Sequence, residues 1–157
     1  MTRCYLDTNF LYLHLRQRDD PVVSAWRGRL ETELAGESGV VSALVLDELA
    51  YRSVLAWLRD GGDKRPVSTF RTSTAAVMRK MRARLDRLWK AVDELNFEFA
   101  ITDGSVMRKA IELMSNPGLA PRDSFHAAHA IDSGCTVIVS SDPDYDRLGA
   151  LRRVGPG

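Results

Sequence analysis

Short apolar runs and longer stretches of helical periodicity alternate along the chain. The short runs are typical of buried strands and cover residues 4–6, 40–42, 97–101, 136–139 and 151–154. Between them, apolar residues recur every three or four positions, which predicts helices over residues 10–16, 22–35, 43–60, 74–92, 103–115 and 121–133. Strands that alternate with helices favour a mostly parallel sheet covered on both faces.

The segment over residues 61–73 interrupts this pattern. It contains Gly, Pro, Ser and Thr without an apolar period, so we expect a loop there. Elsewhere the helix boundaries carry capping signals, namely Asp20 before Pro21, Ser42 after the second strand, and Asp103 at the start of the fifth helix. Each of these side chains is expected to accept a hydrogen bond from the first turn of the helix that follows it.

Length and composition narrow the class of protein. The chain has 157 residues, of which 45% are hydrophobic, and this size fits one domain. The sequence shows neither a signal peptide nor an apolar run near the ~20 residues of a membrane span. We therefore expect a soluble, cytoplasmic protein without a membrane partner. Cys4 and Cys135 lie in apolar, strand-like surroundings without zinc-motif spacing, and we interpret them as reduced core thiols.

The net charge of +1 conceals an asymmetry. Residues 64–90 contain nine basic residues and one acid, a net charge of +8, which leaves 13 basic and 20 acidic residues, or −7, for the rest of the chain. An acidic body with a basic segment indicates a polyanionic partner. The candidate RNA-binding side chains on the helix that begins at Thr74 are Arg79, Lys80, Arg82, Arg84 and Arg87. The competing interpretation is the solvated face of an amphipathic helix.

Four acidic residues occupy positions where an apolar or small residue would be the simpler choice. Asp7 and Asp142 end two predicted strands, Glu48 lies inside the third helix, and Asp123 opens an alanine-rich helix. Taken singly, each has an ordinary explanation as a cap, a first-turn acid favoured by the helix dipole, or a solvated side chain. In a parallel sheet, however, strand ends and the helices after them meet at one edge, where four carboxylates repel one another unless a cation or proton compensates.

The chemistry of such a cluster points to a hard metal ion. Oxygen ligands without Cys or His at ligand spacing suit Mg²⁺ or Mn²⁺. An ion of this kind polarises a phosphoryl oxygen and lowers the pKa of a bound water. The sequence therefore indicates phosphoryl chemistry at the edge of the sheet.

These acids also carry a family resemblance. The chain resembles the PIN-domain nucleases, most closely the VapC-type toxins, in four segments that occur in order: Leu-Asp-Thr-Asn at 6–9, and residues 46–49, 122–128 and 140–145. The resemblance spans almost the whole chain and implies one PIN-like domain, a three-layer α/β/α sandwich with a mostly parallel central sheet. Residues 61–92 form a basic loop-helix segment that departs from the compact toxins. The resemblance also implies a divalent-metal-dependent endoribonuclease that hydrolyses RNA phosphodiesters through a metal-activated water, with Mg²⁺ or Mn²⁺ as cofactor.

The site residues follow from the resemblance position by position. The family's catalytic and metal-binding acids correspond to Asp7, Glu48, Asp123 and Asp142. Its supporting small polar positions correspond to Thr8, Asn9 and Ser141. Asp144 is grouped with these supporting residues, and the role of Asp146 stays open. The resemblance further implies a homodimer and a protein antitoxin that holds the toxin inactive by covering the acidic edge.

Other functions remain open alongside this one. A phosphatase with Asp7 as nucleophile would want a second aspartate two residues on, whereas position 9 is Asn. A nucleic-acid-binding or scaffolding module of the same fold, without turnover, is the alternative from a different class. We interpret His126 and His129 as packing or hydrogen-bonding residues, because their helix is rich in alanine and a metal-activated water needs neither.

Overall fold

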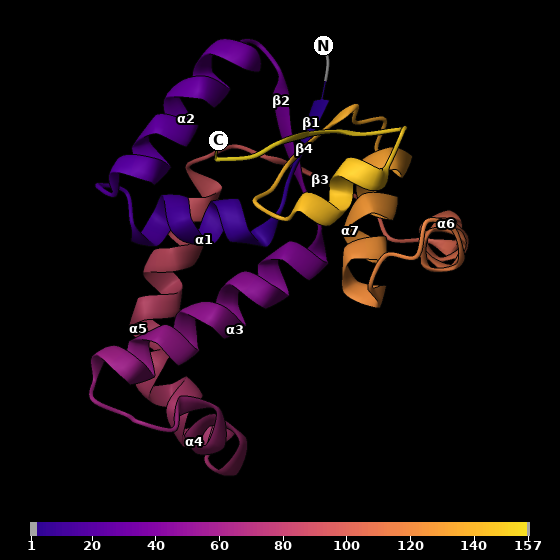
Figure 1. Cartoon of the computed structure of the whole chain (residues 1–157). Helices are drawn as coiled ribbons and strands as arrows, with labels where there is room; N and C mark the ends of the chain where they lie inside the picture. The colour runs from indigo at the N-terminus through magenta and orange to yellow at the C-terminus, as the bar shows by residue number, and fades with distance from the viewer. Residues whose placement is uncertain (1–2, 157) are drawn as a thin grey trace.

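The computed structural model describes residues 3–156, which are built around one central sheet (Figure 1). Five strands, all parallel, lie in the order β3-β2-β1-β4-β5. Their bounds are β1 Arg3–Leu6, β2 Ser38–Val41, β3 Glu98–Phe99, β4 Val137–Val139 and β5 Arg152–Val154. Because β1 is the middle strand, the residue that follows it lies at the centre of the sheet's C-terminal edge.

Helices cover both faces of this sheet. Those of the described residues are α1 Thr8–Arg16, α2 Pro21–Glu33, α3 Ala43–Asp60, α4 Pro66–Thr72, α5 Thr74–Asp93, α6 Gly104–Ser115, α7 Pro121–Asp132 and the short 3₁₀ helix η1 Pro143–Arg147. The predicted α/β/α sandwich with its parallel sheet is confirmed. Within residues 3–156, no helix combines the length and the apolar character needed to cross a membrane.

Two elements differ from the prediction. The loop expected over residues 61–73 is wrong in its second half, where α4 spans Pro66–Thr72. Pro66 is buried in the first turn of α4 and Phe70 packs against neighbouring helices, so tertiary contacts hold a helix too short for a recognisable apolar period. The strand expected over residues 97–101 is reduced to β3, because β2 offers it only Val40 and Val41 as partners.

The side chains of β1 alternate between the two faces of the sheet. Cys4 and Leu6 line a pocket with residues of α2, whereas Tyr5 points to the other face and contacts His126 of α7. All three β1 side chains are buried. The hydroxyl of Tyr5 thus places a polar group between the sheet and the middle of α7.

The predicted caps and thiols agree with the structure. Asp20 and Asp103 each accept backbone N–H groups at the start of their helices, and Ser42 Oγ accepts the N–H of Val45. Cys4 and Cys135 are buried free thiols. Burial raises the pKa of Cys4 to about 11 and that of Cys135 to about 12, so both stay protonated.

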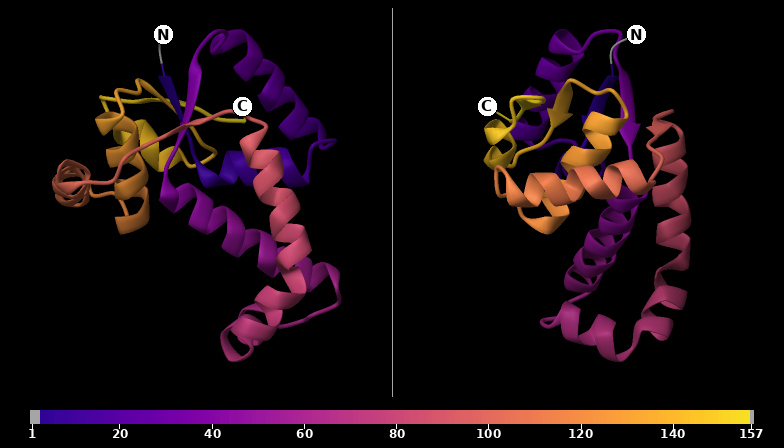
Figure 2. Two further views of the ribbon diagram at one scale, coloured as in Figure 1. Left: turned by 180° about the vertical axis from the view of Figure 1, so that it is seen from behind. Right: turned by 90° about the vertical axis from the view of Figure 1, so that its right-hand side faces the viewer.

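Residues 54–85 form a helical arm that projects beyond the edge where the strands end (Figures 1 and 2). The arm consists of the second half of α3, all of α4 and the first half of α5. Its small core contains Val54, Leu58, Val77 and Met81, with Trp57, Phe70 and Leu85 packed against them. The end of α5 returns to the sandwich, where Val92 joins the main core.

Candidate active site

Asp7 lies directly after β1, at the centre of the C-terminal edge, and is 5% exposed. Its Oδ1 accepts the backbone N–H of Thr8 at 2.6 Å, which makes Asp7 the cap of α1. Its Oδ2 accepts hydrogen bonds from Asn9 Nδ2 at 2.8 Å and from Ser140 Oγ at 2.7 Å. Three donors therefore fix this buried carboxylate in one orientation.

Asn9 and Ser140 join the ends of β1 and β4. Asn9 Nδ2 lies 3.0 Å from Ser140 Oγ, and Asn9 Oδ1 accepts the backbone N–H of Ser141 at 3.1 Å. Ser140 Oγ also accepts the N–H of Asp142 at 3.0 Å. The side chain that contacts Asp7 from β4 is thus the buried Ser140, whereas the exposed Ser141 takes part through its backbone.

Glu48 approaches Asp7 from α3, which begins immediately after β2 and is capped by Ser42. The residue is 9% exposed, although its helix position allowed a solvated side chain. Its Oε1 lies 2.8 Å from Nε of Arg122, at the start of α7. The ion pair connects the second turn of α3 with the first turn of α7 across the edge.

His126 of α7 lies between the two carboxylates. Its Nε2 is 3.4 Å from Glu48 Oε2 and 3.8 Å from Asp7 Oδ1. On the other side of the ring, Nδ1 is 3.0 Å from Tyr5 Oη, which in turn is 2.7 Å from Ser42 Oγ. Buried polar side chains from β1, from the start of α3 and from α7 thus form one connected group.

Asp123 and Asp142 lie on the rim of this group and are half-buried. Asp123 stands in the first turn of α7. Asp142 caps η1, where its Oδ1 accepts the N–H of Asp144 at 2.9 Å. The carboxylate of Asp144 pairs with Arg147 at 2.9 Å, and that of Asp146 pairs with Arg153 at 2.8 Å, so both are engaged by arginines.

Electrostatics ties these acids together. Burial raises the pKa of Asp7 above its ordinary value, although His126 and the Ser140 hydrogen bond oppose the shift. Burial also raises the pKa of Asp123, and the neighbouring charges of Asp142 and Asp7 add to it. Glu48 moves the other way: burial acts to raise its pKa, but nearby His126, Thr8 and Arg122 together hold it below the usual value. A bound cation would relieve the repulsion felt by Asp7 and Asp123.

The residues present fit a divalent cation. Asp7, Glu48 and His126 each offer one ligand atom, and these atoms lie within 4.8 Å of one another. Asp7 Oδ1 accepts one hydrogen bond, from Thr8, and so keeps a second lone pair for a metal ion. Within residues 3–156, no other group of at least three His, Cys, Asp or Glu side chains converges in this way. Asp123 and Asp142 are not in this tightest group, and they act on it through charge.

The basic residues predicted to contact RNA lie on α5, and all of them except Arg87 fall within the helical arm. The side chains exposed there are Arg79, Lys80, Arg82, Arg84 and Arg87. Arg84 lies over the ring of Trp57 at 5.9 Å from its centroid. Next to them, Arg59, Lys64, Arg65 and Arg71 line a pocket of about 590 Å³ at α4. The arm therefore presents cations on all three of its helices.

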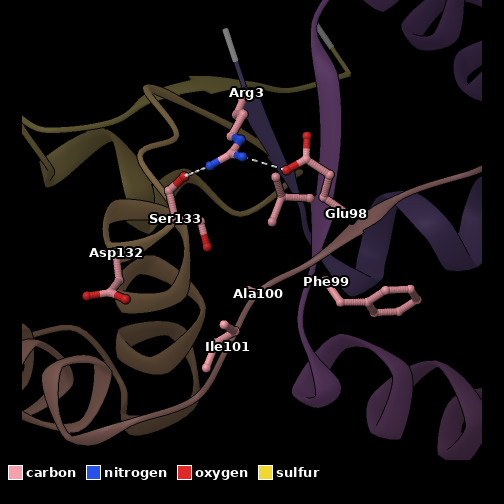
Figure 3. Close-up of a pocket in the computed structure, with 8 residues that line it drawn as sticks. Arg3, Glu98, Phe99, Ala100, Ile101, Asp132 and Ser133 are labelled. Atoms are coloured by element: carbon pink, nitrogen blue, oxygen red, sulfur yellow. Dashed lines mark hydrogen bonds and ion pairs between the residues drawn. The ribbon is translucent and has the colours of Figure 1, made fainter. Parts of the chain in front are cut away.

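A further pocket, of about 260 Å³, lies at the other end of α7 (Figure 3). Arg3 crosses it, donating to the backbone oxygen of Ser133 at 3.2 Å and pairing with Glu98 at 2.8 Å. Phe99 and Ile101 also line it and are exposed. Because α7 runs from Asp123 to this pocket, the two features are about 14 Å apart along the helix. The pocket is separate from the acidic edge.

Three residues of the site were not among the sequence candidates: Tyr5, His126 and Ser140. Asp123 and His126 are three residues apart on one helix, which places them on the same face. Ser140 is the first residue after β4 and therefore occupies the position equivalent to Asp7 after β1. Only the contact between Tyr5 and His126, which are 121 residues apart, left no local signal.

Comparison with known proteins gives a family and a set of similar folds. A family model described as the PIN domain matches residues 4–151. VapBC2 from Rickettsia felis, bound to a DNA fragment from its promoter, is similar over 97% of both chains, with 18% identity and a TM-score of 0.58. DNA-bound VapBC from Salmonella typhimurium is similar over 100% of both chains, with 18% identity and a TM-score of 0.60.

A third similar structure is FitAcB from Neisseria gonorrhoeae, with 20% identity and a TM-score of 0.54. The similarity covers 98% of this chain and 97% of that chain. No curated protein matches the sequence. At these identities the similar structures show the fold alone.

Proposed function

The chain belongs to the PIN-domain family, and on that premise we propose that it is a divalent-metal-dependent endoribonuclease, the toxin of a toxin-antitoxin pair. The observation that carries the proposal is the pair of buried carboxylates, Asp7 and Glu48, held beside one another at the C-terminal edge of a parallel sheet. Buried like charges are unfavourable unless a cation compensates them. Oxygen-rich clusters of this kind suit Mg²⁺ or Mn²⁺.

Each residue has a defined part in the proposed reaction. Asp7 and Glu48 hold the cation from the centre of the edge, and Asp123 and Asp142 complete the acidic surface from the rim. Thr8, Asn9 and Ser140 orient Asp7 through their hydrogen bonds. When bound, the ion lowers the pKa of a water and polarises a phosphoryl oxygen. Because the carboxylates are fixed, the cation that they would hold has one position relative to the attacking water and the scissile phosphate.

RNA is the proposed substrate, and the helical arm is the proposed contact for its backbone. The arm projects on the same side of the sheet as the acidic edge (Figure 1). Its exposed arginines and lysines neutralise phosphates and give affinity without sequence choice. An acidic edge alone would repel a polyanion, so the cations of the arm supply the attraction that the site lacks.

Two protein partners belong to the proposal. The similar structures named VapBC and FitAcB support a protein antitoxin as partner. In the proposal, this antitoxin covers the acidic edge and places a basic side chain there. The ion pair of Arg122 with Glu48 shows how a guanidinium fits this edge. A second copy of the chain is the proposed partner for exposed apolar side chains of β3, of α6 and of the segment between them, namely Phe99, Ile101, Met107 and Ile111. Light scattering tests this contact, because Ile101→Glu with Met107→Glu should convert a dimer to a monomer.

The test of the function compares the native chain with Asp7→Asn, measuring melting temperature and RNA cleavage with and without Mg²⁺ or Mn²⁺. Metal should raise the melting temperature of the native chain, because a ligand stabilises the state that binds it. Asp7→Asn should reduce this rise and abolish cleavage. Asp19→Asn, at an exposed aspartate, serves as the control and should change neither.

Two outcomes would contradict the proposal. A full metal response in Asp7→Asn would remove the metal site from this edge. Metal binding without cleavage of any RNA would instead favour a nucleic-acid-binding or scaffolding module of the same fold.

A further inference from the structure

We propose that Nε2 of His126 is a ligand of the cation at the acidic edge, beside Asp7 and Glu48, and that the site therefore prefers Mn²⁺ to Mg²⁺. The inference rests on the proposed metal site and adds a nitrogen donor to it. The metal-binding residues implied by the family resemblance are four acids, and His126 is not among them.

The distances suit a shared ion. Ligand atoms at about 2.1 Å from one octahedral ion are about 3 Å apart at right angles and about 4 Å apart in line. His126 Nε2 lies 3.4 Å from Glu48 Oε2 and 3.8 Å from Asp7 Oδ1. Both separations fall between these limits, so an ion can lie among the three atoms with small side-chain adjustments.

The nitrogen also lacks another partner. His126 is 1% exposed, and its Nε2 makes no hydrogen bond within the described structure. Buried polar atoms are nearly always hydrogen-bonded or bound to an ion or water. An unpartnered, buried nitrogen that faces two carboxylates is the arrangement expected of a metal ligand.

The opposite side of the ring can accommodate the tautomer that a ligand needs. With the proton on Nδ1, the ring donates to Tyr5 Oη at 3.0 Å, and the Tyr5 hydroxyl donates to Ser42 Oγ at 2.7 Å. The lone pair of Nε2 then points to the acids. Metal-bound histidines are commonly oriented by such a hydrogen bond from the second ring nitrogen.

His129 offers a matched comparison on the same helix. It is 3% exposed and lies one turn further on, where its Nε2 is 3.5 Å from Thr102 Oγ1. The converging ligand atoms do not include His129. A replacement there changes a buried histidine of α7 without touching the acidic edge.

The nitrogen donor alters the choice of metal. Mg²⁺ prefers oxygen ligands, whereas first-row transition ions accept imidazole readily. Among the two ions considered, Mn²⁺ gains from His126 and Mg²⁺ does not. The native chain should therefore bind Mn²⁺ more tightly, and loss of the imidazole should remove most of that preference.

The test uses the untagged full chain loaded with Mn²⁺ and pulsed electron paramagnetic resonance, which detects nitrogen bound to the ion. The native protein should show a ¹⁴N coupling, His126→Gln should lose it, and His129→Gln should keep it. Calorimetric titration with Mn²⁺ and with Mg²⁺ should show that His126→Gln lowers the Mn²⁺ affinity by about tenfold to hundredfold. Mg²⁺ affinity should change much less.

The outcomes separate this inference from the proposed function. If Mn²⁺ binds the native chain but not Asp7→Asn, and no ¹⁴N coupling is seen, His126 is not a ligand while the metal site stands. If the native chain binds neither ion, both proposals fail. If His126→Gln does not fold, Tyr5→Phe decides, because loss of the ring's hydrogen bond should weaken Mn²⁺ binding by about tenfold. Unchanged Mn²⁺ affinity in folded Tyr5→Phe would overturn the inference.

Discussion

The acidic edge and the helical arm use charge in opposite ways. At the edge, Asp7 is buried and held by three donors, and Glu48 is buried beside an arginine and a histidine. On α5 of the arm, the basic side chains are exposed. Among them, Arg84 lies over the ring of Trp57. One region buries its charges and holds them by hydrogen bonds, and the other exposes its charges to solvent.

This difference teaches what each region can contribute. A reaction needs groups held in one geometry, so burial and hydrogen bonds are worth their cost at the edge. A flexible polyanion needs only nearby positive charge, which exposed arginines provide without a fixed alignment to the RNA. We therefore expect abrupt losses from changes at the edge and graded, salt-dependent losses from changes in the arm.

The largest effect should come from Glu48→Gln. The change keeps the shape of the side chain but removes a negative ligand, so cleavage should fall by about two orders of magnitude or more. The metal-free protein should be somewhat less stable at neutral pH, because His126, Thr8 and Arg122 hold the Glu48 carboxylate in its charged form and the glutamine loses these interactions. Cleavage assays and thermal melts measure both effects, with Asp47→Asn, at the adjacent exposed acid, as the control. Equal losses in the two variants would remove the distinction between fixed and solvated acids.

The next effect concerns the small core of the arm. Leu58 is 7% exposed within a cluster of few side chains, and Leu58→Ala should cost about 2–4 kcal/mol. Because the cluster is separate from the main core, the arm should open while the sheet stays closed. Hydrogen exchange should then speed up in α4 and the adjoining parts of α3 and α5. Equal acceleration in β1 and β4 would show that the arm and the sandwich unfold as one unit.

A smaller, graded effect is expected from the exposed cations. Replacing Arg79, Arg82 and Arg87 by Ala should weaken RNA binding and reduce its salt slope by about two, since each phosphate contact to a single strand contributes about 0.7. The folded stability should hardly change. Fluorescence anisotropy at several salt concentrations measures the slope. A control triple variant changes arginines of the sandwich to Ala at Arg18, Arg29 and Arg108. An equal reduction of the salt slope in this control would show that the basic face of the arm is only solvent-exposed and has no special part in RNA binding.

The smallest effect should come from Asp60→Asn. Asp60 ends α3 and pairs with Arg16 of α1 at 2.6 Å, but its side chain is 53% exposed. Exposed ion pairs contribute little, so the loss in unfolding free energy should be below about 1 kcal/mol. Urea denaturation provides the number. A loss as large as that of Leu58→Ala would mean that the ion pair, rather than apolar packing, seats the base of the arm.

Local signals predicted much of the fold. The caps at Asp20, Ser42 and Asp103 depend on residues close in sequence, and apolar runs marked all five strands. The helix α4 was missed because Pro66 and Phe70 are held by contacts with other helices rather than by a period of their own. Propensity and period are weak guides where tertiary packing decides.

The site was predictable in part. Asp7 and Glu48 were selected because strand ends and following helices meet at one edge, and the structure brings them together. The assignment of Asp123 and Asp142 as ligands stays a prediction. His126 was interpreted as a packing or hydrogen-bonding residue, and Ser140 was not selected as a site residue. Their positions, three residues after Asp123 and directly after β4, were visible in the sequence, but their contacts with the acids join segments more than 75 residues apart.

The two outer strands of the sheet are short: β3 has two residues and β5 has three. A short edge exposes few backbone groups with which another chain can pair. Growth of the sheet by added strands, the usual start of aggregation, therefore has little to build on at either side. The proposed contacts with an antitoxin and with a second copy of the chain would therefore be made by side chains rather than by the addition of strands to the sheet.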